Sequence, residues 1–495
     1  MHRRLARTVV FWLILGGLPP QASHAAQDLT VHERHQVSDW FRRTAGRTPH
    51  GQWGIVVGTM AGGVLWSVNP ELELIPASTA KLFTIGFARA RVGGNARIAT
   101  RLIGRGWLDS AGGVWQGGWH LELGGDPTLE RAGRAGPTLR ALAAQLRARG
   151  VRTLQGPLVL TSRTGPALSQ YPAVWAADYA GQIYAPPVGP VTLQENIISL
   201  SLRPGRQVGS PPSFVWAFPR GVERLISMNA TTVGGSRSRL ILRANSEGGW
   251  TLSGGIGIDS RRYGLSAVAH DPSSVLVYAW AAALEAAGIR WIKRTEPPAN
   301  WPAMPSVLAR VQSPPFDSLA VEINRRSLNI GAELVLQWVA ASQTAGPALL
   351  TKHVREVVGP QARVHLVDGS GLSELNRVSA LTQMLYLARY PQAKGAEQFP
   401  LLLPANGRGM RGLRYGMTRG VVRAKTGTLD RVATLAGYLG RPDGVLVISL
   451  LYNGHRIQAA RAAQWELFRL LGAGGVDLKG ALADHMGEAG DQAAD

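Results

Sequence analysis

Ser78-Thr79-Ala80-Lys81, followed downstream by Ser327-Leu328-Asn329 and Lys425-Thr426-Gly427, is the combination of residues that decides the fold of this chain. Lysine is rare in the sequence, which holds 6 Lys against 47 Arg, so a lysine in two of the three runs is informative. Any one short motif carries a high risk of a chance match. The three runs in this order indicate a single site assembled from distant segments.

The first run has the residue types of a nucleophile and its base. A serine hydroxyl is a weak nucleophile until a base removes its proton. Residues three apart share a helix face, so we expect Lys81 to lie beside Ser78. Burial and a neighbouring cation, for which Lys425 is the candidate, would depress the Lys81 pKa toward neutrality and allow it to act as that base. The pattern predicts a serine enzyme that forms an acyl intermediate on Ser78.

The second run extends the predicted catalytic group. Ser327 can relay a proton to a leaving amine, and Asn329 can hydrogen-bond both Lys81 and a substrate amide. The expected catalytic residues are therefore Ser78, Lys81, Ser327 and Asn329.

The third run predicts how a substrate is held. The Lys425 ammonium and the Thr426 hydroxyl can bind a carboxylate, so we expect a substrate that ends in a free carboxylate or a mimic of one. Backbone N–H groups of Ser78, at the helix start, and of Thr428, just after the run, can form an oxyanion hole. The expected substrate-binding residues are Lys425, Thr426, Gly427 and Thr428.

The two ends of the chain have matching patterns. Near the N-terminus the apolar residues predict a helix and then a two-stranded hairpin, over 31–45, 53–59 and 64–68. Near the C-terminus they predict three strands and then a helix, over 421–425, 433–439, 445–451 and 457–471. We therefore expect an α+β, multi-domain chain in which both termini build one antiparallel sheet flanked by helices. The strand-rich middle would be an insertion.

The composition limits the possible partners. The 495 residues carry a formal charge of +21, almost wholly from arginine. A GC-rich genome and a surface that attracts an anionic polymer explain this charge equally well. No nucleic-acid-binding motif accompanies it, so we expect no nucleic-acid partner. The chain has no cysteine, which excludes disulfides, and its 11 scattered His predict neither a metal nor a cofactor.

The N-terminus has the pattern of an export signal. Arg3, Arg4 and Arg7 precede a short apolar run, and Ser23-His24-Ala25 places small residues where a signal peptidase needs them. We expect cleavage after Ala25 and a periplasmic protein with a charge of +18, from 50 basic and 32 acidic residues. The last residues, 476–495, are expected to form a flexible tail without a membrane-binding face, which leaves at most a peripheral association with membrane or wall.

Four blocks of sequence carry a resemblance to a known family. They are Pro76-Ala77-Ser78-Thr79-Ala80-Lys81, Gly124-Gly125-Asp126-Pro127-Thr128-Leu129, Asp368-Gly369-Ser370-Gly371-Leu372-Ser373 and Ala424-Lys425-Thr426-Gly427-Thr428-Leu429. With these blocks the chain resembles the class C low-molecular-mass penicillin-binding proteins, the D-alanyl-D-alanine carboxypeptidase/endopeptidase family. The likeness runs over nearly the whole mature chain.

This resemblance implies a domain plan. The fold would be the penicillin-binding transpeptidase-like (serine β-lactamase-like) fold, with two mainly-β domains inserted, one nested in the other. The expected units are a signal peptide, a split transpeptidase-like domain, a split inserted domain, a nested domain and a tail, over 1–25, 26–94 with 296–475, 95–180 with 250–295, 181–249 and 476–495.

The resemblance also implies a reaction. Ser78 would attack the penultimate D-Ala carbonyl of a peptidoglycan stem peptide, release D-Ala and then be freed by hydrolysis. Endopeptidase members cut the D-Ala–diaminopimelate cross-link by the same route. The implied partners are peptidoglycan peptides, and β-lactam antibiotics that acylate the same serine.

Two departures and two alternatives remain open at this point. Leu328 stands where relatives often carry Asp, and residues 407–417 lack the Asp-Gly-Thr-Leu turn expected there, which puts substrate contacts of that loop in question. A serine β-lactamase or esterase of the same fold is one alternative. However, Glu333 follows Asn329 too closely to activate water as in class A β-lactamases, and it is expected in a helix. The other alternative is a non-catalytic β-lactam-binding or wall-binding protein.

Overall fold

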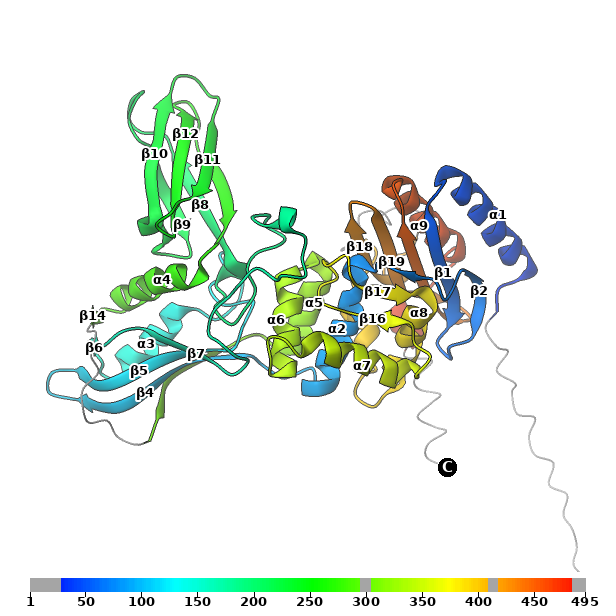
Figure 1. Cartoon of the computed structure of the whole chain (residues 1–495), viewed down its shortest axis with the longest axis horizontal. Coiled ribbons are helices and arrows are strands. Elements are labelled where there is room, and N and C mark those ends of the chain that lie inside the picture. The colour runs from blue at the N-terminus through cyan, green and yellow to red at the C-terminus, as the bar shows by residue number, and fades with distance from the viewer. Residues whose placement is uncertain (1–27, 294–303, 408–416, 483–495) are drawn as a thin grey trace, which may run out of the picture.

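The computed structural model describes residues 28–293, 304–407 and 417–482. The expected signal peptide and most of the 407–417 loop lie outside the described residues. Figure 1 shows a mixed helical and sheet unit that contains both ends of the described chain, and two strand-rich units that are built from the middle of the sequence. Within the described residues, no helix has the length and apolar character needed to cross a membrane.

One antiparallel sheet joins the two ends of the chain, as the sequence predicts. Its strand order is β18-β19-β20-β1-β2, so the N-terminal hairpin continues the C-terminal meander. The bounds are β1 Gln52–Thr59, β2 Val64–Val68, β18 Val422–Leu429, β19 Val432–Arg441 and β20 Gly444–Asn453.

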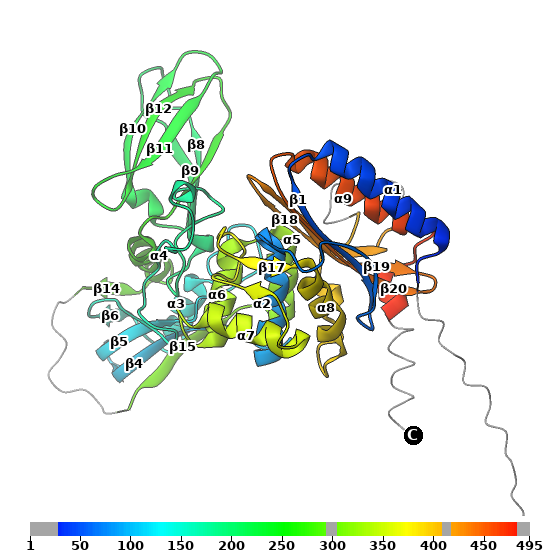
Figure 2. The ribbon, with the colours of Figure 1, turned by 45° about the vertical axis from the view of Figure 1, so that its right-hand side comes forward.

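Alternate residues of these strands enter two separate cores. In β19, Ala433 and Leu435 face one core while Ala436 and Tyr438 face the other, because successive side chains of a strand point to opposite faces. Both faces must therefore be covered. Helices α1 (Val31–Arg47) and α9 (Ile457–Leu471) lie together over one face, as Figure 2 shows.

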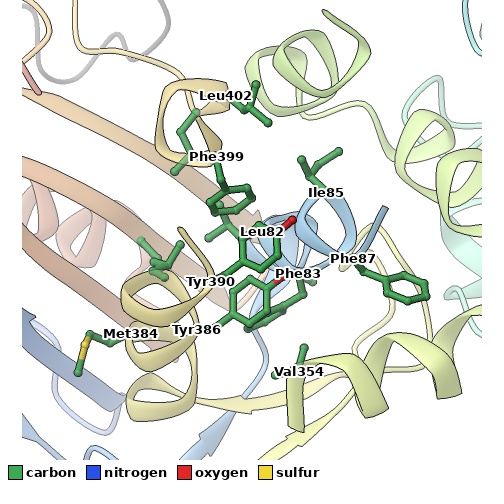
Figure 3. Packing of buried hydrophobic residues seen from close by; sticks show 14 of the residues in the cluster. Leu82, Phe83, Ile85, Phe87, Val354, Met384, Tyr386, Tyr390, Phe399 and Leu402 are labelled. Atoms are coloured by element: carbon green, nitrogen blue, oxygen red, sulfur yellow. The ribbon is translucent and has the colours of Figure 1, made fainter. Parts of the chain in front are cut away.

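The other face carries the helices that hold the site. They are α2 Lys81–Val92, α5 Phe316–Arg326, α6 Asn329–Ala340, α7 Gly346–Val358 and α8 Ala380–Arg389. Aromatic side chains fill the space between them: Phe83 of α2 packs edge-on against Tyr386 of α8, which stacks on Tyr390 (Figure 3). A small sheet closes this side, with strands β3 Glu73–Leu74, β16 Val364–His365 and β17 Arg377–Ser379.

The first inserted domain is a six-stranded sheet backed by two helices. Its strands are β4 Ala99–Asp109, β5 Val114–Leu123, β6 Thr153–Gln155, β7 Val159–Ser162, β14 Arg290–Ile292 and β15 Ser306–Gln312. Helices α3 (Leu139–Ala148) and α4 (Pro272–Ala286) contribute to its own hydrophobic core. This domain is built from two segments of the chain, one before the nested domain and one after it.

The nested domain has two three-stranded sheets that enclose a fourth core. One sheet has the order β10-β12-β11 and the other β13-β8-β9. The bounds are β8 Ile197–Arg203, β9 Ser213–Phe218, β10 Ile226–Val233, β11 Arg239–Ala244, β12 Trp250–Gly257 and β13 Tyr263–Val268. In Figure 1 this unit extends away from the other two.

Short 3₁₀ turns connect many of these elements. They are η1 Ala77–Ala80, η2 Ala177–Tyr179, η3 Gln194–Asn196, η4 Val222–Leu225, η5 Tyr390–Gln392 and η6 Phe399–Leu402.

Three of the expected boundaries are wrong. The nested domain expected over 181–249 extends through β12 and β13, because these strands pair with β10, β11 and β8. The inserted domain expected to end at 295 includes β15, which pairs with β4 across its whole length. The tail expected from residue 476 is packed at its start, since Leu478 is fully buried and its N–H donates to Gly420 O. Residues 483–495 lie outside the described residues.

Candidate active site

Ser78 is held in the 3₁₀ turn η1, directly before α2. Pro76 and Ala77 turn the chain from β3 into η1, and Ala77 adopts a left-handed conformation with φ of 46°. Thr79 Oγ1 donates to Pro76 O at 2.7 Å and fixes this turn. Ser78 is half-buried, whereas the residues on either side of it are buried. The hydroxyl of Ser78 is therefore the accessible group of the run.

Lys81 lies beside Ser78, as its spacing predicts. Its side chain is completely buried, and its Nζ donates to Ser78 Oγ at 3.0 Å. Nζ also donates to Asn329 Oδ1 at 2.7 Å and to Ser370 O at 2.6 Å. Burial lowers the pKa of Lys81 to about 7, against the opposing effect of the Asp368 and Glu333 charges. The structure thus provides a lysine that can lose its proton near neutral pH, in contact with a serine hydroxyl.

The second run occupies the turn between α5 and α6. Ser327 is in the left-handed region, with φ of 55°, and directs its hydroxyl toward the third run. Leu328 packs against hydrophobic core residues, so the departure from Asp at this position affects packing and not the polar group. Asn329 is buried, and its Nδ2 donates to Tyr184 O at 2.9 Å. The inserted region therefore fixes the orientation of the Asn329 amide.

The third run lies on the edge strand β18. Lys425 Nζ donates to Ser327 Oγ at 3.0 Å and to Thr426 O at 2.6 Å, which brings the second and third runs together. Burial, and then the neighbouring charges of Lys81 and Arg461, hold the pKa of Lys425 well below its ordinary value. Thr426 is half-buried and Thr428 is exposed, so both can meet a bound molecule.

Gly427 permits the close approach of β18 to Ser78. A Cβ on this residue would lie 2.8 Å from Ser78 N and 2.9 Å from Pro76 O, with Thr434 Oγ1 at 2.3 Å. Real side chains do not approach backbone atoms so closely, and backbone cannot move aside as a flexible side chain can. The third run therefore needs glycine at this position for a steric reason.

Sequence reasoning did not assign a role to the buried carboxylates that hold the loop in contact with Lys81. Glu333 lies in α6, as expected, and its buried carboxylate accepts from Gly369 N at 3.0 Å and Ser370 N at 2.7 Å. Asp368 accepts from Gly371 N at 2.8 Å and Ser373 N at 2.7 Å. Burial and then the charge of Asp368 raise the pKa of Glu333. These carboxylates fix the loop that presents Ser370 O to Lys81, and the Asp368-Gly369-Ser370-Gly371 block was the available signal.

Arg461 of α9 is a further residue that sequence reasoning missed, and no motif in the sequence marks it. Its guanidinium donates to Thr434 O at 2.6 Å, to Thr428 Oγ1 at 3.0 Å and to Gly427 O. Burial lowers its pKa to about 10, so it remains charged at neutral pH. Arg461 therefore adds a permanent positive charge behind the strand that carries Lys425.

The structure brings together the three runs that hold the eight residues named from the sequence. Contacts join Ser78, Lys81 and Asn329 in one group and Ser327 and Lys425 in another, and Gly427 lies against Ser78. A serine activated by a buried lysine, beside a cationic edge strand, can carry out acyl transfer from a substrate with a carboxylate. Site and fold together define a serine enzyme of the penicillin-binding, transpeptidase-like class.

Comparison with known proteins identifies the family. The model of the D-Ala-D-Ala carboxypeptidase 3 (S13) family matches residues 40–472, and the chain belongs to that family of serine-type carboxypeptidases. A D-alanyl-D-alanine carboxypeptidase of Actinomadura sp. (strain R39) is 27% identical over 433 residues, which cover 83% of this chain and 79% of the relative. A carboxypeptidase of Mycobacterium tuberculosis is 26% identical over 416 residues, 81% of this chain and 76% of the relative.

A solved structure has the same fold. Penicillin-binding protein 4 of Haemophilus influenzae superposes with a TM-score of 0.68 at 19% identity, covering 86% of this chain and 99% of that one. This similarity confirms the expected penicillin-binding fold.

The contact between Gly427 and Ser78 leads to a first prediction. Gly427→Ala should reduce the rate of covalent labelling by a fluorescent penicillin by about 100-fold, because a shift of about 1 Å between serine and strand has an effect of that size. Gly46→Ala is the matched control, since a Cβ there has no atom within 4 Å. Labelling of Gly427→Ala at the wild-type rate would contradict the steric role.

Proposed function

We propose that this carboxypeptidase acts on peptidoglycan stem peptides through an acyl-enzyme on Ser78, removing the terminal D-Ala, cleaving D-Ala–diaminopimelate cross-links, or both. The observation that carries the proposal is the buried Lys81 amine, 3.0 Å from Ser78 Oγ and with a pKa of about 7. The printed description of the relative from Actinomadura names the same D-alanyl-D-alanine activity.

The proposed reaction has two steps. Neutral Lys81 accepts the Ser78 proton as Oγ bonds to the carbonyl carbon, and the backbone N–H groups of Ser78 and Thr428 stabilise the oxyanion. The C–N bond then breaks as the proton held by Lys81 passes through Ser327 to the leaving amine, which leaves Lys81 neutral again. Neutral Lys81 accepts a proton from water as the water oxygen bonds to the acyl carbon. The bond from that carbon to Ser78 Oγ then breaks, and Lys81 returns the proton to Oγ, which restores the hydroxyl and releases the product acid.

Lys425, Thr426 and Arg461 support recognition of the free carboxylate. In the empty site, burial and two neighbouring cations disfavour the charged form of Lys425. A bound carboxylate would reverse this effect, because an opposite charge nearby raises a lysine pKa. Arg461 stays charged throughout and contributes long-range attraction from behind β18.

We further propose that the protein is exported to the periplasm after cleavage at Ala25, where such substrates are found, and that β-lactams acylate Ser78. The pattern of residues 1–25 supports export. The Haemophilus influenzae relative has been solved in complex with a β-lactam. The position of Glu333 disfavours a class A β-lactamase, because both of its oxygens accept from backbone N–H groups.

Digestion of pentapeptide monomers and cross-linked muropeptide dimers, read by mass spectrometry, tests the function. We expect loss of one D-Ala from the monomer, dimer cleavage, or both, and no product from Ser78→Ala because the nucleophile is absent. Absence of products from the wild type, with stoichiometric penicillin labelling, would contradict the peptidase and favour a β-lactam sensor. Products from folded Ser78→Ala would contradict the assignment of the nucleophile.

The pKa of Lys81 predicts the pH dependence of acylation. The base must be neutral, so the second-order rate of acylation by benzylpenicillin should rise about tenfold per pH unit below about pH 7 and level off above it. Glu333→Gln removes a negative charge that favours the Lys81 cation, so the midpoint of the pH profile of this variant should lie at lower pH than that of the wild type. A flat profile between pH 5 and 9, with an unchanged circular dichroism spectrum, would exclude Lys81 as the base.

Recognition of the carboxylate by Lys425 gives a further prediction. Wild-type enzyme should hydrolyse a peptide ending in a free carboxylate about 10- to 100-fold better, in kcat/KM, than the same peptide with a terminal amide, since a charge-assisted hydrogen bond contributes about 1.5–3 kcal/mol. Lys425→Ala should remove most of this preference, because it should slow hydrolysis of the peptide with the free carboxylate and leave hydrolysis of the amide unchanged. An equal loss for acid and amide would show that Lys425 has no part in carboxylate binding.

A further inference from the structure

The nested domain carries an excess of positive charge. Between residues 197 and 268, the nested domain has nine Arg, no Lys and three acidic residues. All nine arginines are exposed, and six of them lie on the loops and strand ends at the end of the domain farthest from α4. They are Arg203, Arg206, Arg237, Arg239, Arg261 and Arg262, and we call this group the arginine tip.

Hydrogen bonds hold the loops of the arginine tip together. Ser238 Oγ and Ser260 Oγ are 2.8 Å apart, and Asp259 N donates to Gly235 O, so the loops that carry Arg237 and Arg261 are joined. The pairing of Tyr263 with Leu202 places Arg262 next to Arg203. Gly205 N donates to Thr232 Oγ1 at 2.7 Å, which brings the loop of Arg206 to the end of β10. The six arginines thus lie on adjoining loops and strand ends at one end of the domain.

The acidic residues of the domain are mostly at its opposite end. Glu223 lies in η4, and Gly221 in the same turn packs on Tyr278 of α4. Glu247 lies in the turn that also approaches Asp271 at the start of α4. Only Asp259 lies among the tip loops. Among the described residues, the one ion pair from this domain joins Arg224 to Glu285 of α4, so the tip arginines are not neutralised by acidic neighbours.

We propose that the arginine tip is a docking surface for peptidoglycan, and that it binds carboxylates of the wall outside the active site. This inference rests on the proposed function, because the substrate is then part of a polymer that repeats the same anionic group. Guanidinium groups bind carboxylates in a bidentate manner, and several together attract a polyanion at long range. A second point of attachment raises the effective concentration of stem peptides at Ser78.

The apolar residues at the tip favour a polymer over a lipid bilayer. Proteins that bind a membrane surface bury an apolar, often aromatic, face in it. The exposed large apolar residues at or next to the arginine tip are Val208, Val233, and Val215 and Trp216 of β9, so only one of them is aromatic. Trp216 pairs with Ser201, two residues before Arg203 in β8, and one aromatic side chain beside six arginines is a small apolar face for insertion into a bilayer.

Pelleting with purified sacculi tests the proposal, using Ser78→Ala protein so that the wall is not digested. The tip variant carries Arg237→Gln, Arg239→Gln, Arg261→Gln and Arg262→Gln. The control removes the same charge from four exposed arginines of the inserted domain, with Arg105→Gln, Arg149→Gln, Arg152→Gln and Arg290→Gln. At low salt we expect the tip variant to bind at least about tenfold more weakly and the control to bind as the parent does, and added salt should release the parent.

Three outcomes would overturn the proposal. Equal losses in both variants would show an effect of net charge alone, and no loss in the tip variant would exclude the surface. Tip-dependent binding to vesicles that contain anionic lipid, without binding to sacculi, would assign the surface to a membrane. The protein that carries the four tip substitutions and retains Ser78 should hydrolyse a small soluble pentapeptide at the same rate as the wild type. Failure of the wild type in that assay would refute the proposed function separately.

Discussion

The burial of the Lys81 amine is the constraint on which the rest of the site depends. A charged or polar amine removed from water must be hydrogen-bonded, or its burial is strongly unfavourable. Lys81 meets this need with Ser78 Oγ, Asn329 Oδ1 and Ser370 O, and the latter two are 248 and 289 positions away in the sequence. Three distant segments must therefore be in place before the lysine can be buried, and its lowered pKa follows from that burial.

The parts of the site that the sequence revealed are those in which chemistry requires a side chain of one type. Ser78, Lys81 and Lys425 are such residues, and their order in the chain was sufficient. The supporting groups act through the backbone: Tyr184 offers a carbonyl to Asn329, and Glu333 accepts from two backbone N–H groups. Every residue has a carbonyl and nearly every residue an N–H, so no pattern distinguishes the ones that matter.

The fold shows the same division. Strands of the main sheet were predictable because both faces are buried, so β19 and β20 read as short, nearly continuous apolar runs bounded by turns. The limits of the inserted domains were not, because they depend on which strands pair. β15 is the next strand after β14 in sequence yet pairs with β4, and β12 pairs in parallel with β10. Pairing partners are determined by packing in three dimensions, so the local sequence of a strand does not identify its partner.

The position of β1 in the main sheet has a consequence for how the molecule is made. Its strand neighbour β20 lies near the C-terminal end of the sequence, and Gln52 of β1 pairs with Asn453 of β20. Contacts of such high sequence separation slow folding. A chain that emerges N-terminus first therefore carries an apolar β1 that is paired with β2 on one edge only, until residues 444–453 arrive, and such an open edge invites aggregation. The complete site, which needs Lys425 of β18 as well as Ser78, can form only once most of the chain is present.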